Sequence, residues 1–263
     1  MFRSPLAATC SAATVLALSG FLIGAASTSP AHAAEVKLLG PLAMRAVFAD
    51  IMPQFEKASG HKVTADLATI GVITDRLTKG EAADVAIVSG AQNEALQKLG
   101  KLVAGSRVEV ARVGYSAFVR KGTPKPDLGS ADALKRTLLA AKSIAYGDPA
   151  GGGPSGIYMA GLMQRLGIAA EVKAKTRLLA PGGAVTDAVV KGEVEIAFSV
   201  NSDGVTVAGL DTYPLPAEVQ SYTLYAAGIV AGGKQADAAK ALIAFLATPA
   251  AKQAMTAKGF EPR

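Results

Sequence analysis

Cysteine and histidine are almost absent from this 263-residue chain, which has one cysteine and two histidines. Cys10 and His32 both lie in the first 33 residues, so the rest of the chain carries His61 alone. Disulfides, thiolate metal sites and Ser-His or Cys-His nucleophilic machinery are therefore not available there. His61 follows Gly60 at a predicted helix end, where we expect a solvated side chain rather than a catalytic base.

Long apolar runs and runs of like charge are also scarce. Beyond the N-terminal segment, no stretch is long and apolar enough to span a membrane. The formal net charge is +6, and the lysines and arginines are scattered among few aromatic residues. Nucleic-acid binders gather such charges on one face, so this pattern suits a small acidic ligand better.

The first 33 residues have the features of a secretory signal peptide. Arg3 gives a positive start, the run 12–26 is apolar, and Ala-His-Ala at 31–33 is a small-x-small cleavage site. The apolar run is shorter than a membrane span. We expect cleavage after residue 33, which leaves 34–263 as an exported protein without cysteine.

Strand-like and helix-like patterns alternate along the exported part. Short apolar runs bounded by Gly and Pro predict strands, and apolar residues at helical spacing predict helices. The predicted strands are 36–39, 62–68, 84–88, 108–120, 173–179, 194–200 and an apolar run that begins at 143. The predicted helices end at 59, 79, 99, 167, 191, 247 and 258, and Pro53 should kink or shorten the first of them. This alternation predicts an α/β fold with largely parallel sheets.

One unit of loop, helix and strand occurs twice. The loop 69–71 opens a helix that ends in Lys-Gly-Glu at 79–81 and leads into a strand. The loop 181–183 opens a second helix, which ends in Lys-Gly-Glu at 191–193 and again leads into a strand. The repetition predicts two similar α/β lobes, and the cleft between two lobes is a favoured place for a small ligand.

The stretch 143–167 sets a loop rich in Gly and Pro between a strand and a helix. Ser155 follows Pro154 at the expected N-cap, so free N–H groups and the positive end of the helix dipole point out of the loop. A small anion could dock there, although an ordinary strand-loop-helix connection is an equally good interpretation. The glycines at 151, 153 and 156 match G-x-G-x-x-G, but no acidic residue stands at the required offset and no Gly-Lys-Ser/Thr closes the loop.

Further glycine-containing loops precede helices at 40–41, 70–71 and 182–184. Several helix starts that converge would hold an oxyanion or a carboxylate through N–H donors without a formal positive charge. Arg45 lies one turn into the first helix and could form a bidentate pair with a carboxylate. The alternative is a surface arginine on the polar face of that helix.

These residues, with the signal peptide, resemble the type II periplasmic solute-binding proteins of ABC importers, most closely the molybdate-binding branch. The most specific segments are Gly-Asp-Pro at 147–149, Pro-Ser-Gly-Ile-Tyr at 154–158 and Leu-Gly at 166–167, similar to that branch's GDP…PAGIY…LG. The resemblance implies two lobes, lobe 1 with residues 34–114 and 222–263 and lobe 2 with residues 115–221. It also implies a ligand enclosed by hinge motion and delivery to an inner-membrane permease.

The oxyanion contacts of this branch carry over only in part. Its two serines fall at Ala43 and Ile70, and its tyrosine falls at Val200, so three hydroxyl donors are missing. Each lost donor should cost about 1.5–3 kcal/mol of binding to a dianion. The ligand-binding residues that we expect are Ala43, Arg45, Thr69, Ile70, Gly71, Ser155, Gly156, Gly183, Ala184, Val185 and Asn201.

The sequence thus predicts a periplasmic protein that captures a small anion, either a molybdate- or tungstate-like oxyanion or an organic carboxylate. We expect a monomer that serves an ABC importer, without metal, cofactor, nucleic-acid partner or enzymatic activity. Two alternatives stay open, an exported enzyme with dehydratase-like activity and a ligand-sensing component of a receptor, both on the same two-lobed scaffold.

Overall fold

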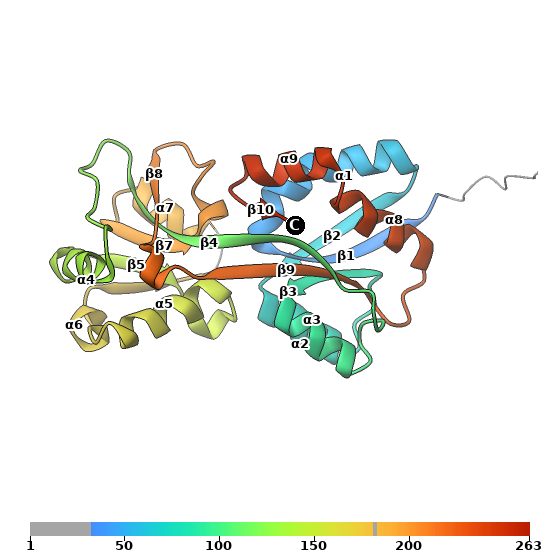
Figure 1. Ribbon diagram of the computed structural model, residues 1–263, viewed down its shortest axis with the longest axis horizontal. Coiled ribbons are helices and arrows are strands. Elements are labelled where there is room, and N and C mark those ends of the chain that lie inside the picture. Colours follow the sequence, from blue (N-terminus) through green and yellow to red (C-terminus); the bar gives the residue numbers. More distant parts are fainter. Residues whose placement is uncertain (1–32, 181–182) are drawn as a thin grey trace, which may run out of the picture. The chain divides into compact units, whose positions relative to one another are not determined.

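The computed structural model describes residues 33–180 and 183–263, and Figure 1 shows how their elements are arranged. The predicted signal peptide, apart from its last residue, lies outside the described residues. Within the described ranges, no helix has both the length and the apolar character needed to cross a membrane.

The strands join in the order β2-β1-β3-β9-β4-β7-β5-β6, and β8 and β10 pair with β4. Their bounds are β1 Glu35–Pro41, β2 Lys62–Ala68, β3 Val85–Ser89, β4 Val108–Arg120, β5 Ile144–Gly147, β6 Thr176–Leu179, β7 Ile196–Val200, β8 Leu210–Pro214, β9 Tyr222–Ile229 and β10 Glu261–Pro262. Strands alternate with helices along the chain, which confirms the predicted α/β class.

Two groups of parallel strands have the same topology. In the first group, β1 lies between β2 and β3 and is parallel to both. In the second group, β5 lies between β6 and β7 and is again parallel to both. Each group is thus a central strand followed by its two neighbours in the same order, as the repeated loop-helix-strand unit predicts.

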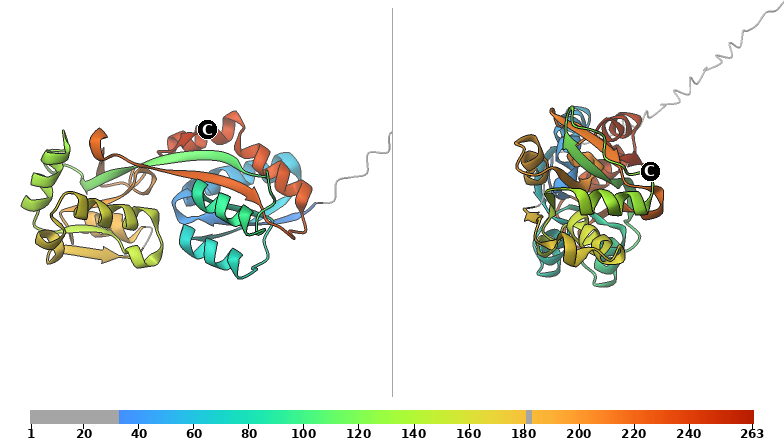
Figure 2. Two further views of the ribbon diagram at one scale, coloured as in Figure 1. Left: turned by 60° about the horizontal axis from the view of Figure 1, so that its bottom comes forward. Right: turned by 90° about the vertical axis from the view of Figure 1, so that its left-hand side faces the viewer.

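The two longest strands, β4 and β9, are antiparallel to each other. Strand β9 is also antiparallel to β3 of the first group, and β4 to β7 of the second. Residues 108–114 of β4 pair with β9, whereas 115–120 pair with β7 and β8. Where the partner changes, the Gln220 side chain accepts from the Tyr115 N–H at 2.9 Å and donates to the Tyr115 carbonyl at 3.0 Å. Strands β4 and β9 lie side by side in both views of Figure 2. The predicted lobe boundaries at 114/115 and 221/222 stay a prediction.

Helices cover both faces of each group. Around the first group, α1 (Arg45–Ser59), α8 (Ala236–Leu246) and α9 (Pro249–Ala257) lie on one side, and α2 (Ile70–Thr78) and α3 (Gly90–Lys98) on the other (Figure 1). The second group carries α4 (Ala131–Ala140), α5 (Pro154–Arg165), α6 (Ala169–Lys173) and α7 (Ala184–Val190). Short 3₁₀ turns complete the chain, namely η1 (Leu42–Met44), η2 (Pro149–Gly151), η3 (Asn201–Asp203) and η4 (Ala217–Val219).

Local capping explains where several helices start. The side chains of Thr69, Ser89, Ser130 and Thr248 accept hydrogen bonds from first-turn N–H groups of α2, α3, α4 and α9. Helix α1 ends at Gly60, whose φ of 75° is the left-handed conformation that glycine adopts most easily.

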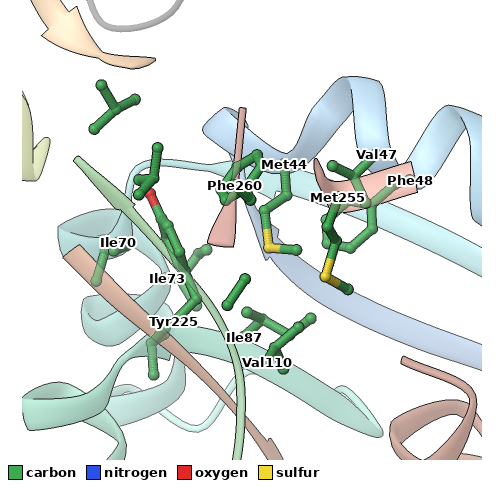
Figure 3. Packing of buried hydrophobic residues seen from close by; sticks show 14 of the residues in the cluster. Met44, Val47, Phe48, Ile70, Ile73, Ile87, Val110, Tyr225, Met255 and Phe260 are labelled. Carbon is green, nitrogen blue, oxygen red and sulfur yellow. The ribbon is translucent and has the colours of Figure 1, made fainter. Parts of the chain in front are cut away.

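Side-chain alternation along the buried strands separates two cores. In β5, Ile144 and Tyr146 face one apolar cluster and Ala145 faces the other, which also contains Val185 and Val189 of α7. The larger cluster extends through the first group, where Tyr225 packs edge-on against Phe260 with ring centroids 5.9 Å apart (Figure 3).

The predicted N-cap of α5 is wrong, and so is the shortening that was one of the two predicted effects of Pro53. Ser155 is not the N-cap of α5: the cap is Gly153, because Pro154 suits the first helical position and Ser155 becomes the second. Pro53 does not shorten α1, which continues from Arg45 to Ser59.

Candidate functional site

A cavity of about 40 Å³ lies at the carboxyl ends of β1 and β2 in the first group and of β5 and β7 in the second. Its lining comes from the segments that follow β1, β2, β5 and β7, together with one residue of β9. The lining residues are Pro41, Leu42, Ala43, Ala68, Thr69, Ile70, Gly153, Pro154, Ser155, Val200, Asp203 and Tyr225. In open α/β sheets, ligands bind beyond the carboxyl ends of the strands, so the cavity lies where the topology favours a ligand.

Helix starts supply much of the cavity wall. Thr69 caps α2, and Gly153 caps α5 without any side-chain hydrogen bond, which leaves the first-turn N–H groups of α5 without a side-chain acceptor. The chain after β1 enters η1 and then α1 beside them. Unsatisfied N–H groups and the positive dipole ends favour an anion here.

Contacts between the two groups close one side of the cavity. The Thr69 hydroxyl donates to the Gly151 carbonyl at 2.8 Å, and the Gly71 N–H donates to the Gly152 carbonyl at 3.3 Å. A Cβ atom added to Gly71 would lie 3.1 Å from the Cα of Gly152. Glycine at position 71 therefore allows the two backbones to touch.

A carboxyl group lines the same cavity. Ser199 donates a hydrogen bond to Asp203 with an O···O distance of 2.6 Å. Burial raises the pKa of Asp203 to about 6, although the Ser199 hydrogen bond and the charge of Arg45 act to lower it. Asp203 in turn contributes, with burial as the main cause, to a raised pKa of Tyr225.

The family model described as bacterial extracellular solute-binding protein matches residues 36–261. This chain belongs to that family. An aconitate isomerase from a Pseudomonas species is 33% identical over 220 residues, which cover 81% of this chain and 82% of that relative. The molybdate-binding protein ModA of Azotobacter vinelandii is 29% identical over 254 residues, covering 94% and 96%.

Solved structures of periplasmic binding proteins share the fold. The Azotobacter vinelandii periplasmic molybdate-binding protein superposes with a TM-score of 0.73 at 18% identity, over 86% of this chain and 98% of that chain. The sulfate-binding protein SubI from Mycobacterium tuberculosis has a TM-score of 0.69 at 18% identity, covering 87% of each chain. The predicted resemblance to type II solute-binding proteins near the molybdate branch is confirmed.

The cavity brings together some of the residues that we predicted for this solute-binding protein. Ala43, Thr69, Ile70 and Ser155 line it, and Gly71 forms the contact that closes it. Arg45 lies outside the lining and acts on Asp203 through its charge.

Other predicted residues have different surroundings. A Cβ atom on Gly156 would lie 2.2 Å from the Gly147 carbonyl oxygen, so this glycine allows α5 to approach β5. The Asn201 side chain accepts from Ser116 at 3.1 Å and donates to the Gly259 carbonyl at 3.1 Å. Neither these two residues nor the predicted segment at the start of α7 (Gly183, Ala184 and Val185) lines the cavity.

Sequence reasoning missed Asp203 and Tyr225 as cavity residues. The predicted loss of the family's tyrosine at Val200 pointed to this wall of the cavity, but no sequence pattern pointed to Asp203. Tyr225 lies in the middle of a strand of small and apolar residues, where no local pattern distinguishes a core side chain from a cavity side chain.

Proposed function

We propose that this solute-binding protein captures a small organic carboxylate in the cavity and delivers it to an ABC importer. The observation that carries the proposal is the pairing of an acidic and a basic group at one anion-binding cavity, Asp203 in the lining and Arg45 beside it. An ionised Asp203 would repel molybdate and a carboxylate alike, unless the pair of anionic groups retains one proton. A carboxylic acid can share a proton with Asp203 and accept from Arg45.

Three further features support a carboxylate. The helix starts supply N–H donors, and Ser155 and Tyr225, whose side chains carry hydroxyl groups, line the same space. A volume of about 40 Å³ fits roughly three waters by the usual allowance, which is the size of a carboxylate with its nearest atoms. An adjoining groove of about 650 Å³ shares Ile70 and Pro154 with the cavity and offers room for the rest of a larger acid.

Capture and delivery imply that the cavity opens and closes. The Thr69–Gly151 and Gly71–Gly152 hydrogen bonds join the two strand groups and would break on opening. A ligand that bonds to both groups would favour the closed form. Export through the predicted signal peptide would place the protein beside an inner-membrane permease, as for the periplasmic relatives.

A thermal-shift panel of residues 34–263 tests the proposal, with mono-, di- and tricarboxylates set against molybdate, tungstate, sulfate and phosphate. A ligand at 100 times its Kd adds roughly 2.7 kcal/mol of stability, which raises Tm by a few degrees. We expect a carboxylate to give the largest shift. A shift with molybdate or tungstate alone would contradict the proposed cargo.

The Arg45→Ala variant separates the two classes of anion. We expect it to lose most of the carboxylate shift, because the guanidinium pairs with carboxylates in a planar fork. Arg136→Ala is the matched control, since Arg136 on α4 is 69% exposed and its ion-pair partner, Asp127, is 3.8 Å away. Equal carboxylate binding by both variants would remove Arg45 from the site.

Isomerisation of an unsaturated acid is the second candidate function. The relative named aconitate isomerase is 33% identical, and Asp203 could take a proton from one carbon and return it to another without a redox cofactor. Incubation with pure cis- or trans-aconitate, followed by NMR, would reveal the other isomer. Loss of turnover in Asp203→Asn, with turnover kept in the exposed Asp237→Asn control, would establish the activity.

A further inference from the structure

We propose that Asp203 contacts the bound anion directly and that ligand binding takes up one proton, which the carboxyl and the anion then share. The inference rests on the proposed function of the cavity and deepens it by assigning a proton-linked residue.

Asp203 lies in the wall of the cavity. It belongs to η3, which directly follows β7, and it lines the cavity together with Val200 and Tyr225. A valine at position 200 has no polar atom, so the cavity wall around η3 takes its polarity from Asp203. An anion in about 40 Å³ of space therefore lies within contact range of this carboxyl.

The hydrogen bonding of Asp203 leaves capacity for a ligand. Ser199 donates to Oδ2, while Oδ1 forms no hydrogen bond with the residues that the structure describes. Within the same ranges, Arg45 makes no ion pair with Asp203 at 4.0 Å or less. One carboxyl oxygen is thus available, and its charge is not neutralised by a direct contact.

The groups that surround Asp203 come from four elements. Arg45 at the start of α1 and Tyr225 on β9 are the titratable groups that act on it or respond to it. Ser199 on β7 donates the hydrogen bond to Asp203. From β4, Phe118 lies against Gly204 and Ser116 donates to Asn201. None of these three side chains titrates in the neutral range. Burial raises the pKa of Asp203 to about 6, and Ser199 and Arg45 act against that rise.

A bound anion makes the ionised form of Asp203 still less favourable. Two like charges in contact cannot both persist at low dielectric, so the pair retains a proton. The resulting O–H···O⁻ hydrogen bond is of the strong, charge-assisted kind. We expect affinity to fall about tenfold for each pH unit above 6, because one proton must be taken up for each anion bound.

Isothermal titration calorimetry of residues 34–263 tests the inference, with sulfate and aconitate as probes between pH 5.5 and 8. Sulfate does not titrate in this range, so any proton that it brings in must bind to the protein. At pH 7.5, measurements in HEPES and Tris, which differ in protonation enthalpy, give the number of protons taken up. At pH 7.5 we expect close to one proton for the wild type and for the Asp237→Asn control. At pH 5.5 we expect less than half a proton, because Asp203 is then largely protonated before the anion binds.

Two variants make the assignment specific. Asp203→Asn should bind without proton uptake, with an affinity that no longer depends on pH and exceeds that of the wild type about tenfold at pH 7.5. Ser199→Ala should move the wild-type pH profile to higher pH, because the Ser199 hydrogen bond lowers the pKa of Asp203.

The outcomes are distinct. If wild type and Asp203→Asn bind with the same pH profile, the inference is overturned while the proposed function stands. If neither probe binds either protein at pH 5.5 and the carboxylate panel gives no shift, the proposed function fails and the inference fails with it. If Asp203→Asn does not fold, an unchanged profile in Ser199→Ala overturns the inference by itself.

Discussion

In the first strand group, the helical segments that follow β1 and β2 both start at the cavity. In the second group, only the helix that follows β5 starts there. The second group instead supplies η3, with Val200 and Asp203. The first group contributes N–H donors, a hydroxyl and, beside the cavity, Arg45. The second contributes helix α5 and the carboxyl group.

The shared topology thus fixes where the site lies, and the loops decide its chemistry. Each group points the carboxyl ends of its parallel strands toward the cavity, so any residue placed just after a strand can reach it. Val200 and Asp203 line one wall of the cavity, and side chains at such positions can change without a change in the order of the strands. Variants that act on one group alone can test this division.

The largest expected effect compares the close approaches in the two groups. Gly156→Ala places Cβ 2.2 Å from the backbone carbonyl of Gly147, which cannot rotate away. Gly40→Ala places Cβ 2.7 Å from the Phe48 ring, a side chain that can move. We expect Gly156→Ala to lower the free energy of unfolding by about 3 kcal/mol and Gly40→Ala by about 1–2 kcal/mol, measured by urea denaturation. Equal losses would show that α5 can shift as readily as a side chain.

The next effect concerns the acidic wall alone. The pKa of Asp203 rises from 3.8 to about 6 on folding, so the folded protein binds more protons than the unfolded chain between these values. The free energy of unfolding should therefore fall as pH rises from 4 to 6, by about 1–3 kcal/mol. In Asp203→Asn, the free energy of unfolding should lack this decrease between pH 4 and 6. Stability curves that stay parallel from pH 4 to 7 would contradict the assignment.

Contact between the groups gives a smaller effect on binding. Gly71→Ala meets the Gly152 backbone at 3.1 Å and should favour separation of the two loops. We expect ligand affinity to fall about tenfold, since the closed form becomes less populated. Gly161→Ala in α5, which meets only the end of the Arg165 side chain, is the control. Unchanged affinity in Gly71→Ala would mean that the ligand does not require this contact.

The smallest effect uses the repeated Lys-Gly-Glu sequences. Glu81 bonds to Arg76 and Lys37, with Arg76 as the main cause of a pKa lowered to about 2, whereas Glu193 pairs with Arg177 at 3.0 Å. Glu81→Gln should lower Tm by one or two degrees at pH 7, and the difference should shrink as pH falls from 4.5 toward 2. Glu193→Gln should change Tm less. A larger loss in Glu193→Gln would reverse the comparison.

Local patterns were enough to predict much of the fold. The predicted strands at 62–68 and 108–120 coincide with β2 and β4, because β-branched and alternating residues leave little choice there. Helix α4 and strands β8 and β9 were missed. The sequence of β9 is dominated by small and apolar residues, and its pairing with β3 and β4 comes from distant segments.

The candidate site, too, was predictable from the sequence only in part. Helix starts at Thr69 and near Ser155 are local features, so they could be placed before the structure was known. Asp203 and Tyr225 reach the cavity only through the sheet order, which joins β7 and β9 to opposite sides of β4. Asn201 looked suitable because a free amide is a good ligand donor, but Ser116 and the Gly259 carbonyl already use it.

The bonds between Gln220 and Tyr115 have a mechanical consequence. Elsewhere along β4, neighbouring strands are joined backbone to backbone, and turning one strand against the other would break the ladder. At Tyr115 the Gln220 side-chain amide supplies two hydrogen bonds beside the backbone bond from the Leu215 N–H to the Tyr115 carbonyl at 3.1 Å, so one partner of the strand there is a side chain with torsions of its own. We therefore expect β4 to resist bending less at this position than along the rest of its length. If the proposed opening and closing takes place, its balance would then be set at the cavity and by the ligand that fills it.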